Sequence, residues 1–291
     1  MATAALLPCA AQAQADDPTK RRIPTTGEEI FPIGLGSWIT FNVGNDPLLR
    51  DSSAAVMQAF LAAGGQLIDS SPMYGSAQDV IGYGLEKYGR PDALFSADKV
   101  WTSSPGNGPA QIEQSRRYWG VPRFDLLQVH NLLAWESHLP QLFEMKAAGT
   151  LRYVGITTSE GRRRTSFEEI MRTQPLDFIQ ITYNALDRSV EERILPLAQD
   201  RGIGVIVNRP FRQGRLTERL AYEPLPEWAN EYGAKSWAQI LLKFILSHPA
   251  ISVAIPATTR IDHAVENIAA ASGPLPDVAM RERISTFVRD L

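Results

Sequence analysis

Eight short apolar runs recur along the chain, and each is followed by an amphipathic stretch. Successive runs begin 35, 27, 31, 28, 25, 26 and 48 residues apart, and most of these intervals are near the roughly 30 residues of a strand–helix–strand unit. The stretches between them repeat apolar residues at three and four residue spacing, which is typical of helices. The predicted helices cover residues 54–63, 78–88, 110–119, 139–148, 166–173, 191–200, 236–247 and 263–271. The runs begin at Phe31, Gln66, Ala93, Phe124, Arg152, Asp177, Ile203 and Ile251.

The predicted strands are apolar along their whole length, which is typical of a parallel sheet covered on both faces. Eight strand–helix units in one chain predict a single-domain α/β fold, a (β/α)8 TIM barrel over residues 23–291. An open, doubly wound sheet remains an alternative, because periodicity alone does not prove that the sheet closes.

The composition favours a small-molecule partner. Hydrophobic residues make up 44% of the chain, and the formal net charge is −3 with Lys and Arg scattered, so neither a nucleic-acid partner nor a membrane span is expected. The four histidines lack metal-ligand spacing and Cys9 is the single cysteine, so no metal site is expected.

Residues 1–22 form a leader-like or disordered segment. The stretch up to Ala15 is small and apolar and ends in Ala-Gln-Ala, as a secretory leader does, but no basic residue precedes Lys20. A start inside a longer exported precursor and an Ala-rich cytoplasmic extension both explain this pattern. We prefer the first explanation, and with it a periplasmic location over a cytoplasmic one.

Four ionisable residues stand where predicted strands end. They are Asp69, Tyr74 in the loop that follows, Lys99 and His130. Each alone has an easy structural explanation, but in a barrel all four converge at the end that holds active sites. Lys99 is expected to lower the pKa of the Tyr74 phenol, Asp69 to hold the ammonium, and His130 to position a carbonyl oxygen. Tyr74 is therefore the candidate general acid.

The sequence resembles the aldo-keto reductase superfamily. The matching motifs are GLGSW at Gly34, Asp-Ser-Ser-Pro-Met-Tyr-Gly at Asp69, DKV at Asp98, QVHN at Gln128, VGITTS at Val154, QITYN at Gln180, IPATT at Ile255 and VEN at Val265. The resemblance implies a monomeric barrel that binds a nicotinamide dinucleotide without a Rossmann domain and reduces a small-molecule carbonyl substrate. It also implies that the four residues above form the catalytic tetrad.

The resemblance further implies cofactor contacts. Gln180 would hold the carboxamide, with Thr157 and Thr158 in place of the usual Ser-Asn pair, and Glu266 and Asn267 would lie near the adenine. Asn208 stands where many members stack a tyrosine on the nicotinamide, so another ring such as Phe211 would have to compensate. Thr258, Thr259 and Arg260 are the expected 2′-phosphate contacts. NADPH is therefore the expected cofactor, with NADH possible.

A Pro- and Arg-rich segment, residues 209–234, follows the seventh run. It is a candidate lid or cofactor clasp, and the simpler alternative is a surface excursion. Within it, the candidate cofactor residues are Pro210, Phe211, Arg212 and Gly214.

Four aromatic residues lie at or just past predicted strand ends. They can wall a substrate pocket, or they can be ordinary packing. These residues are Trp38, Phe41, Trp101 and Trp135.

Two hypotheses of function follow. The first is a catalytic carbonyl reductase, and the second is a barrel that binds a cofactor or a partner without turnover, which the altered cofactor residues suggest. We favour catalysis, because a non-catalytic barrel has no need to keep all four ionisable groups together.

Overall fold

Eight parallel strands form the centre of the computed structural model, which describes residues 20–291. They are hydrogen-bonded in the order of the sequence, from β3 to β10, and each lies next to its sequence neighbour. The strands are β3 (Leu35–Gly36), β4 (Leu67–Asp69), β5 (Phe95–Val100), β6 (Leu126–Val129), β7 (Tyr153–Thr157), β8 (Phe178–Thr182), β9 (Gly204–Asn208) and β10 (Ile251–Ala254).

The first and last strands of this sheet meet, so the sheet closes on itself. Ile33 bridges Ala254 in parallel, and the Gly34 amide donates to the Ala254 carbonyl at 2.8 Å. A Cβ atom at Gly34 would lie 2.9 Å from the Leu67 carbonyl oxygen of β4 and 3.0 Å from the side chain of Ile255, which directly follows β10, so the close packing at this junction requires glycine. The predicted (β/α)8 barrel is confirmed, and the open sheet is wrong.

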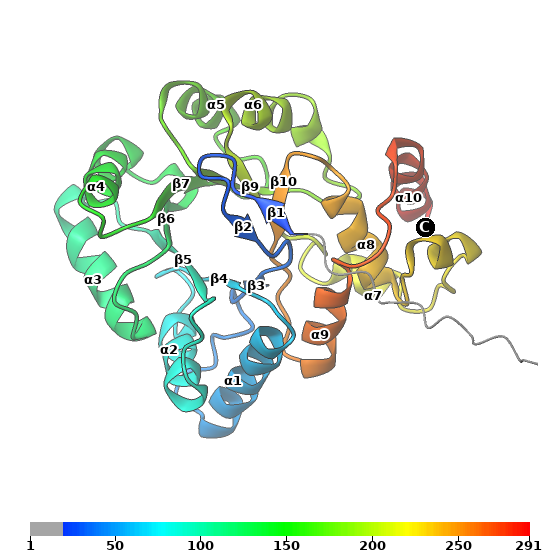
Figure 1. The fold of residues 1–291 in the computed structure, drawn as a ribbon, viewed down its shortest axis with the longest axis horizontal. Helices are drawn as coiled ribbons and strands as arrows, with labels where there is room; N and C mark the ends of the chain where they lie inside the picture. The colour runs from blue at the N-terminus through cyan, green and yellow to red at the C-terminus, as the bar shows by residue number, and fades with distance from the viewer. Residues whose placement is uncertain (1–19) are drawn as a thin grey trace, which may run out of the picture.

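Eight helices surround the barrel (Figure 1), and each overlaps a stretch that the sequence predicts to be helical. They are α1 (Pro47–Ala62), α2 (Ala77–Tyr88), α3 (Gly108–Trp119), α4 (Trp135–Ala147), α5 (Arg164–Thr173), α6 (Ile194–Arg201), α8 (Trp237–Leu246) and α9 (Ile261–Ala269).

Helix α1 begins seven residues before its predicted start at Ala54. The Asp46 side chain accepts hydrogen bonds from the amides of Leu48 at 2.9 Å and Leu49 at 3.1 Å, and Pro47 occupies the first helical position. This Asp-Pro pair is a helix-start signal. The apolar periodicity does not reveal this start of α1, because Leu48 and Leu49 are exposed and do not pack on the barrel.

The segment 209–234 contains the short helix α7 (Arg215–Arg219) and the 3-10 helix η4 (Glu227–Tyr232). Its second half lies on the outer flank of the barrel. There Trp228 packs edge-on to Trp237 of α8, and Phe287 of the C-terminal helix α10 (Val278–Asp290) stacks on Trp237 at 5.0 Å. Only the first half, next to the end of β9, is placed to act on the barrel opening.

The apolar residues form two cores. One fills the inside of the barrel with layers of side chains such as Leu67, Phe95, Phe178 and Val253. The other lies between the outer face of the strands and the helices. This division is why the strands are apolar along their length.

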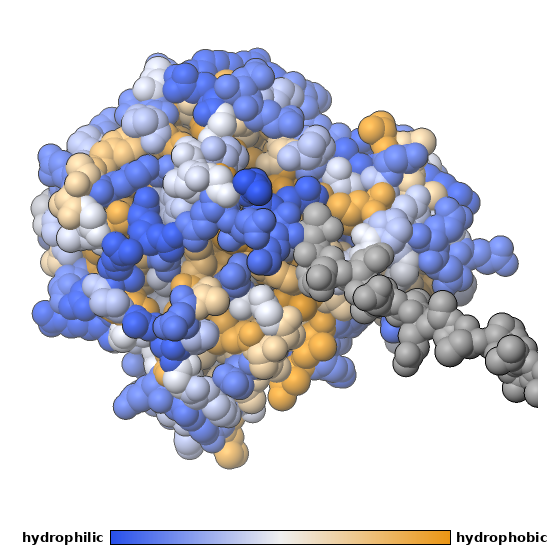
Figure 2. Space-filling view, in the orientation of Figure 1, coloured by the Kyte–Doolittle hydropathy of each residue, from blue (hydrophilic) through white to orange (hydrophobic). Residues whose placement is uncertain are grey.

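A short hairpin closes the amino end of the barrel. Strands β1 (Arg21–Arg22) and β2 (Glu29–Ile30) pair antiparallel, and Ile23 and Ile30 belong to the interior core. In Figures 1 and 2 the hairpin crosses the centre of the visible face, where hydrophilic residues gather. The predicted boundary after residue 22 places Arg21 and Arg22 in the leading segment, but both residues take part in the fold.

Residues 1–19, which carry the leader-like pattern, lie outside the described residues, so the leader remains a prediction. Within residues 20–291, no helix is both long and apolar enough to cross a membrane.

Candidate functional site

The four predicted catalytic residues come together at the carboxyl ends of the strands, which we call the mouth. Asp69 is the last residue of β4, Lys99 lies one residue before the end of β5, and His130 directly follows β6. Tyr74 lies in the loop after β4. Because β4, β5 and β6 are parallel neighbours, their ends bring residues far apart in sequence to one place.

A buried ion pair forms the base of the site. Lys99 Nζ donates to Asp69 Oδ2 at 2.6 Å and to the Ser70 carbonyl at 2.7 Å. The side chains of Lys99 and Asp69 are 0% and 2% exposed. Burial alone would lower the pKa of Lys99, but its negatively charged surroundings, with the charge and hydrogen bond of Asp69 foremost, outweigh burial and raise the pKa. The ammonium therefore stays charged inside the protein.

Tyr74 lies against this ion pair and is half-buried. Lys99 Nζ is 5.0 Å from the centre of its ring, and the His130 ring meets it edge-on at 5.7 Å. Burial raises the pKa of Tyr74, and Lys99 opposes this shift without overcoming it. The expectation of a lowered pKa is therefore wrong, because removal from water penalises the phenolate more than one nearby ammonium stabilises it. The phenol keeps its proton at neutral pH.

His130 is held in a neutral state. Burial, together with the charge of Lys99, lowers the pKa of His130 to about 3. Its Nδ1 lies 2.8 Å from the hydroxyl oxygen of Ser71. An imidazole with this pKa offers one N–H donor at any ordinary pH.

A chain of amide groups leads from the ion pair across the mouth. Gln180, on β8, donates to Asp69 Oδ1 at 2.8 Å. Asn208, at the end of β9, donates to Gln180 Oε1 at 3.4 Å and to the Thr158 carbonyl at 3.2 Å. Three of the predicted cofactor residues therefore lie in one hydrogen-bonded network with the tetrad.

Two threonines and an asparagine border this network. The Thr157 hydroxyl accepts a hydrogen bond from the backbone N–H of Asn131 at 3.1 Å. The side-chain oxygen of Asn131, Oδ1, is buried without a partner in the described part of the chain. The Thr158 hydroxyl already donates to the Arg162 carbonyl at 2.7 Å. The free polar atom here belongs to Asn131 and not to Thr158.

The first half of the 209–234 segment reaches over the mouth. Arg209 forms an ion pair with Glu160, after β7, and its guanidinium lies 5.7 Å from the ring centre of Trp38, after β3. The four predicted cofactor residues follow directly. Pro210 is buried, Phe211 and Gly214 are half-buried, and Arg212 is exposed.

The predicted 2′-phosphate residues lie between β10 and α9. Thr258 is buried, whereas Thr259 and Arg260 are exposed and line a groove of about 590 Å³ beside α1 and α2. The Arg260 guanidinium is engaged by Asp262, with Nε to Oδ1 at 3.0 Å. On α9 itself, Glu266 is half-buried and Asn267 is buried.

The four predicted pocket aromatics differ in exposure. Trp38 and Trp101 are 37% and 39% exposed, but Phe41 is 1% exposed and lies in the outer core. Trp135 begins α4 and is half-buried against the same core. Phe41 therefore presents almost no surface to a ligand.

Comparison with known proteins shows the family of this chain. The family model described as "Aldo/keto reductase family" matches residues 32–284. The chain belongs to the aldo/keto reductase family. It is an oxidoreductase, and its reaction is the NAD(P)H-dependent reduction of a small carbonyl compound.

Individual relatives agree with the family match. Aldo-keto reductase YhdN of Bacillus subtilis is 29% identical over 69% of this chain, and the match spans 64% of that relative's length. The NADH-specific methylglyoxal reductase of Escherichia coli is 26% identical over 75% of each chain. An aldo/keto reductase from Klebsiella pneumoniae, solved with NADP and acetate, has a TM-score of 0.75 at 22% identity, over 90% of this chain and 92% of that one.

Sequence reasoning did not single out two polar residues of the candidate site. Ser71 lies two residues after Asp69 in the motif that ends at Gly75, and Asn131 directly follows His130. Both residues stand at strand ends, and in a barrel this position alone could have marked them as candidate site residues. Ser71 meets His130 across 59 residues of sequence, and the Asn131 backbone amide meets Thr157 across 26 residues, so no local pattern indicated these contacts.

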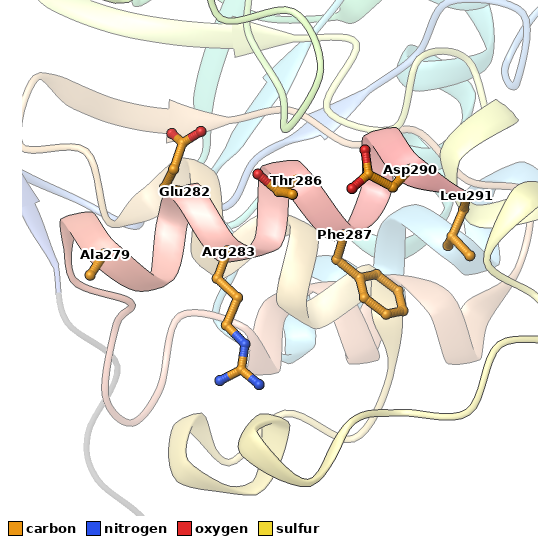
Figure 3. A pocket seen from close by; sticks show the side chains of 7 residues that line it. All are labelled: Ala279, Glu282, Arg283, Thr286, Phe287, Asp290 and Leu291. Carbon is orange, nitrogen blue, oxygen red and sulfur yellow. The ribbon is translucent and has the colours of Figure 1, made fainter.

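A second cavity lies away from the mouth of the reductase. It has a volume of about 540 Å³ and lies along α10, where Arg283 and Phe287 leave the helix on one side and Glu282 and Asp290 on the other (Figure 3). It contains none of the predicted site residues. Within residues 20–291, no group of three or more His, Cys, Asp or Glu side chains is arranged to hold a metal ion.

Proposed function

We propose that Tyr74 is the general acid that protonates the carbonyl oxygen of the substrate. The observation that carries this proposal is the position of the Tyr74 ring, which lies 5.0 Å from the buried ammonium of Lys99 and edge-on to His130. A protonated phenol can donate its proton, and the ammonium next to it stabilises the phenolate that is left.

Asp69 and Lys99 act together behind the acid. Asp69 keeps Lys99 charged and fixes its Nζ atom through the 2.6 Å hydrogen bond. The charge of Lys99 is therefore in place before the reaction, and no reorganisation is needed when the phenolate forms. His130 supplies a neutral N–H donor that orients the carbonyl oxygen toward Tyr74.

The residues at the mouth fit a nicotinamide ring with its carboxamide. A carboxamide has both hydrogen-bond donors and an acceptor. At the mouth, the side-chain amides of Gln180 and Asn208 have donor and acceptor atoms of their own. The buried Asn131 Oδ1 is a further acceptor and has no partner among the described residues. The hydroxyl of Thr157 borders the same place. When bound, the reduced nicotinamide supplies a hydride to the carbonyl carbon.

The remaining predicted cofactor residues would hold the rest of the dinucleotide. Pro210, Phe211, Arg212 and Gly214 would line its path from the mouth, and Glu266 and Asn267 would contact the adenine. Thr258, Thr259 and Arg260 would receive a 2′-phosphate. NADPH is therefore the preferred cofactor, but the Arg260–Asp262 pair weakens that preference, so NADH is also accepted.

Small aldehydes are the proposed substrates of a monomeric enzyme. Trp38 and Trp101 at the rim are exposed enough to border a substrate, with Trp135 behind them. A relative that acts on methylglyoxal makes this compound a suitable first test.

The test compares two Tyr→Phe variants. With NADPH and a panel of aldehydes that includes methylglyoxal, Tyr74→Phe should lower kcat by about 10²- to 10⁴-fold, the range of general acid catalysis. Tyr222→Phe is the matched control, because Tyr222 is 96% exposed. Equal rates in the wild type and Tyr74→Phe would reject Tyr74 as the general acid, whereas no turnover in the wild type would favour a barrel that binds without turnover.

A further inference from the structure

The imidazole of His130 has one close polar neighbour on its Nδ1 side. Ser71 Oγ lies 2.8 Å from Nδ1, and both side chains are buried, with exposures of 0% for Ser71 and 6% for His130. The same Ser71 oxygen accepts a hydrogen bond from the Met73 amide at 3.2 Å. His130 Nε2 makes no hydrogen bond to any residue between 20 and 291.

The hydrogen bonds decide which atom is the donor. If His130 Nδ1 carried the proton, Ser71 Oγ would accept from both Nδ1 and Met73. The Ser71 O–H would then be left without an acceptor, since no other partner of Ser71 Oγ occurs in the described chain. A buried hydroxyl without an acceptor is unfavourable. If Ser71 donates to Nδ1, the Ser71 O–H and the Nδ1 lone pair are both satisfied, and the Nε2–H is left free at the mouth.

We propose that Ser71 is a positioning residue whose hydroxyl donates to His130 Nδ1, fixing the ring and placing its one proton on Nε2. The inference deepens the proposed function, because Nε2–H is the donor left free at the mouth to orient the carbonyl oxygen. A ring with the proton on Nδ1 would present a lone pair there instead, which repels that oxygen.

The electrostatics of the site support this assignment. Burial and the charge of Lys99 lower the pKa of His130, so the ring is neutral and only one of its nitrogens carries a proton. The choice of nitrogen therefore matters, and the hydrogen bond at the other nitrogen sets it.

The neighbouring serine does not share this role. The carbonyl of Ser70 accepts from Lys99 Nζ at 2.7 Å, but its hydroxyl is buried without a partner within the described residues. The two serines that follow Asp69 thus serve different members of the tetrad, Ser70 through its backbone and Ser71 through its side chain.

The first test is ¹⁵N NMR of the imidazole nitrogens in the uniformly labelled, full-length protein. The chain has four histidines, and the His130 signals are assigned by their loss in His130→Gln. We expect an unprotonated Nδ1 and a protonated Nε2 in the wild type, and a change toward mixed tautomers in Ser71→Ala. A protonated Nδ1 in the wild type, or an unchanged His130 spectrum in Ser71→Ala, would overturn the proposal.

The second test is kinetic. Ser71→Ala should lower kcat with NADPH and methylglyoxal more than it changes KM, by about 10- to 100-fold, as when the outer partner of a metal-bound histidine is removed. Ser71→Thr keeps a hydroxyl at this position and should recover most of the rate. Full activity of Ser71→Ala, or no recovery in a folded Ser71→Thr, would contradict the inference.

A matched control separates positioning from stability. Ser285 of α10 is 1% exposed and donates to the Ala185 carbonyl at 2.7 Å, and within the described residues it makes no hydrogen bond to the tetrad or to Ser71. Ser285→Ala also removes a buried serine hydroxyl, so it should lower stability without changing kcat or the His130 spectrum. If the wild type reduced no carbonyl compound, the proposed function would fail, whereas the NMR test of the tautomer would still give its own answer.

Discussion

The two ends of the barrel use the same kinds of residues for different purposes. At the mouth, Asp69 and Lys99 form a buried ion pair beside Tyr74. At the amino end, Arg152 pairs with Glu28 of the hairpin and with Asp125 at 2.7 Å.

A tyrosine also completes the cluster at the amino end. Tyr153 donates to Glu28 at 2.6 Å, and its hydroxyl lies 3.0 Å from that of Thr26. The hairpin covers this cluster, so its hydrogen-bonding groups are used within the protein. At the mouth, the Nε2 atom of His130 is left without a partner among residues 20–291. A carboxylate, a cation and a tyrosine therefore stabilise the fold where they are enclosed, and they are available for chemistry where one side stays open.

Removing the cation from each cluster should give the largest difference. Lys99→Met leaves Asp69 buried without a counter-ion, so the free energy of unfolding should fall by about 3–5 kcal/mol and kcat by about 10²- to 10⁴-fold. Chemical denaturation and turnover with NADPH measure the two effects.

Arg152→Met is the matched variant at the amino end. Because Arg152 is 30% exposed, its loss should cost about 1 kcal/mol and leave kcat unchanged. A loss of kcat in Arg152→Met comparable to that in Lys99→Met would break the comparison between the two ends.

The tyrosine at the amino end should matter for stability alone. Tyr153→Phe removes the hydroxyl that bonds Glu28 and Thr26, which should lower the free energy of unfolding by about 1–3 kcal/mol. The kcat and KM values should equal those of the wild type. The comparison would be weakened by a Tyr153→Phe variant that unfolds like the wild type but turns over more slowly.

Acid should destabilise the protein through His130. Its pKa is about 3 in the folded protein and about 6.5 in the unfolded chain, so the unfolded chain binds more protons between these pH values. The stabilisation is fully present above pH 6.5 and is lost as the pH falls toward 3. Lowering the pH from about 6.5 to 5 should therefore reduce the free energy of unfolding by about 1–2 kcal/mol.

Denaturation curves of the wild type and His130→Gln at both pH values measure this contribution. His248, whose pKa is lowered to about 4, acts in the same direction and remains in the variant. The pH dependence of the variant should therefore be weaker than that of the wild type but not absent. Equal pH dependence in the two proteins would show that His130 is not held neutral by its surroundings.

The smallest expected effect concerns an exposed ion pair. Asp262→Asn frees Arg260 from its partner, so the Kd for NADPH should fall by about two- to fivefold while the Kd for NADH changes little, and added salt should reduce the difference. Fluorescence titration measures both. Glu29→Gln removes the exposed Lys20–Glu29 pair at the amino end and is the control. An equal change in both variants would show that Asp262 does not compete with the 2′-phosphate.

Much of the fold follows from local pattern. Eight apolar runs predict eight strands, and the spacing predicts a helix after each, because a strand–helix unit needs a fixed length of chain. The hairpin was not predicted, since strands of two residues such as Arg21–Arg22 are too short to show a period. The start of α1 was misplaced because its first turns are exposed, and Asp46 and Pro47 marked it instead.

The sequence also predicted that the four ionisable residues meet at one end of the barrel, but it did not predict their electrostatics. Asp69, Lys99 and His130 were placed by their positions at strand ends. The pKa of Tyr74 was expected to fall, whereas burial raises it, and the extent of burial depends on loops and strands distant in sequence. The same holds for Ser71 and His130, which are 59 residues apart.

The order of residues along the chain thus determined which groups stand at the mouth, because parallel strands carry their last residues to one edge. Only the closed barrel decided how far each group is removed from water, which hydrogen bonds it makes, and which polar atoms remain free. Desolvation and hydrogen-bond geometry depend on every neighbour in space, and most of those neighbours are far away in sequence.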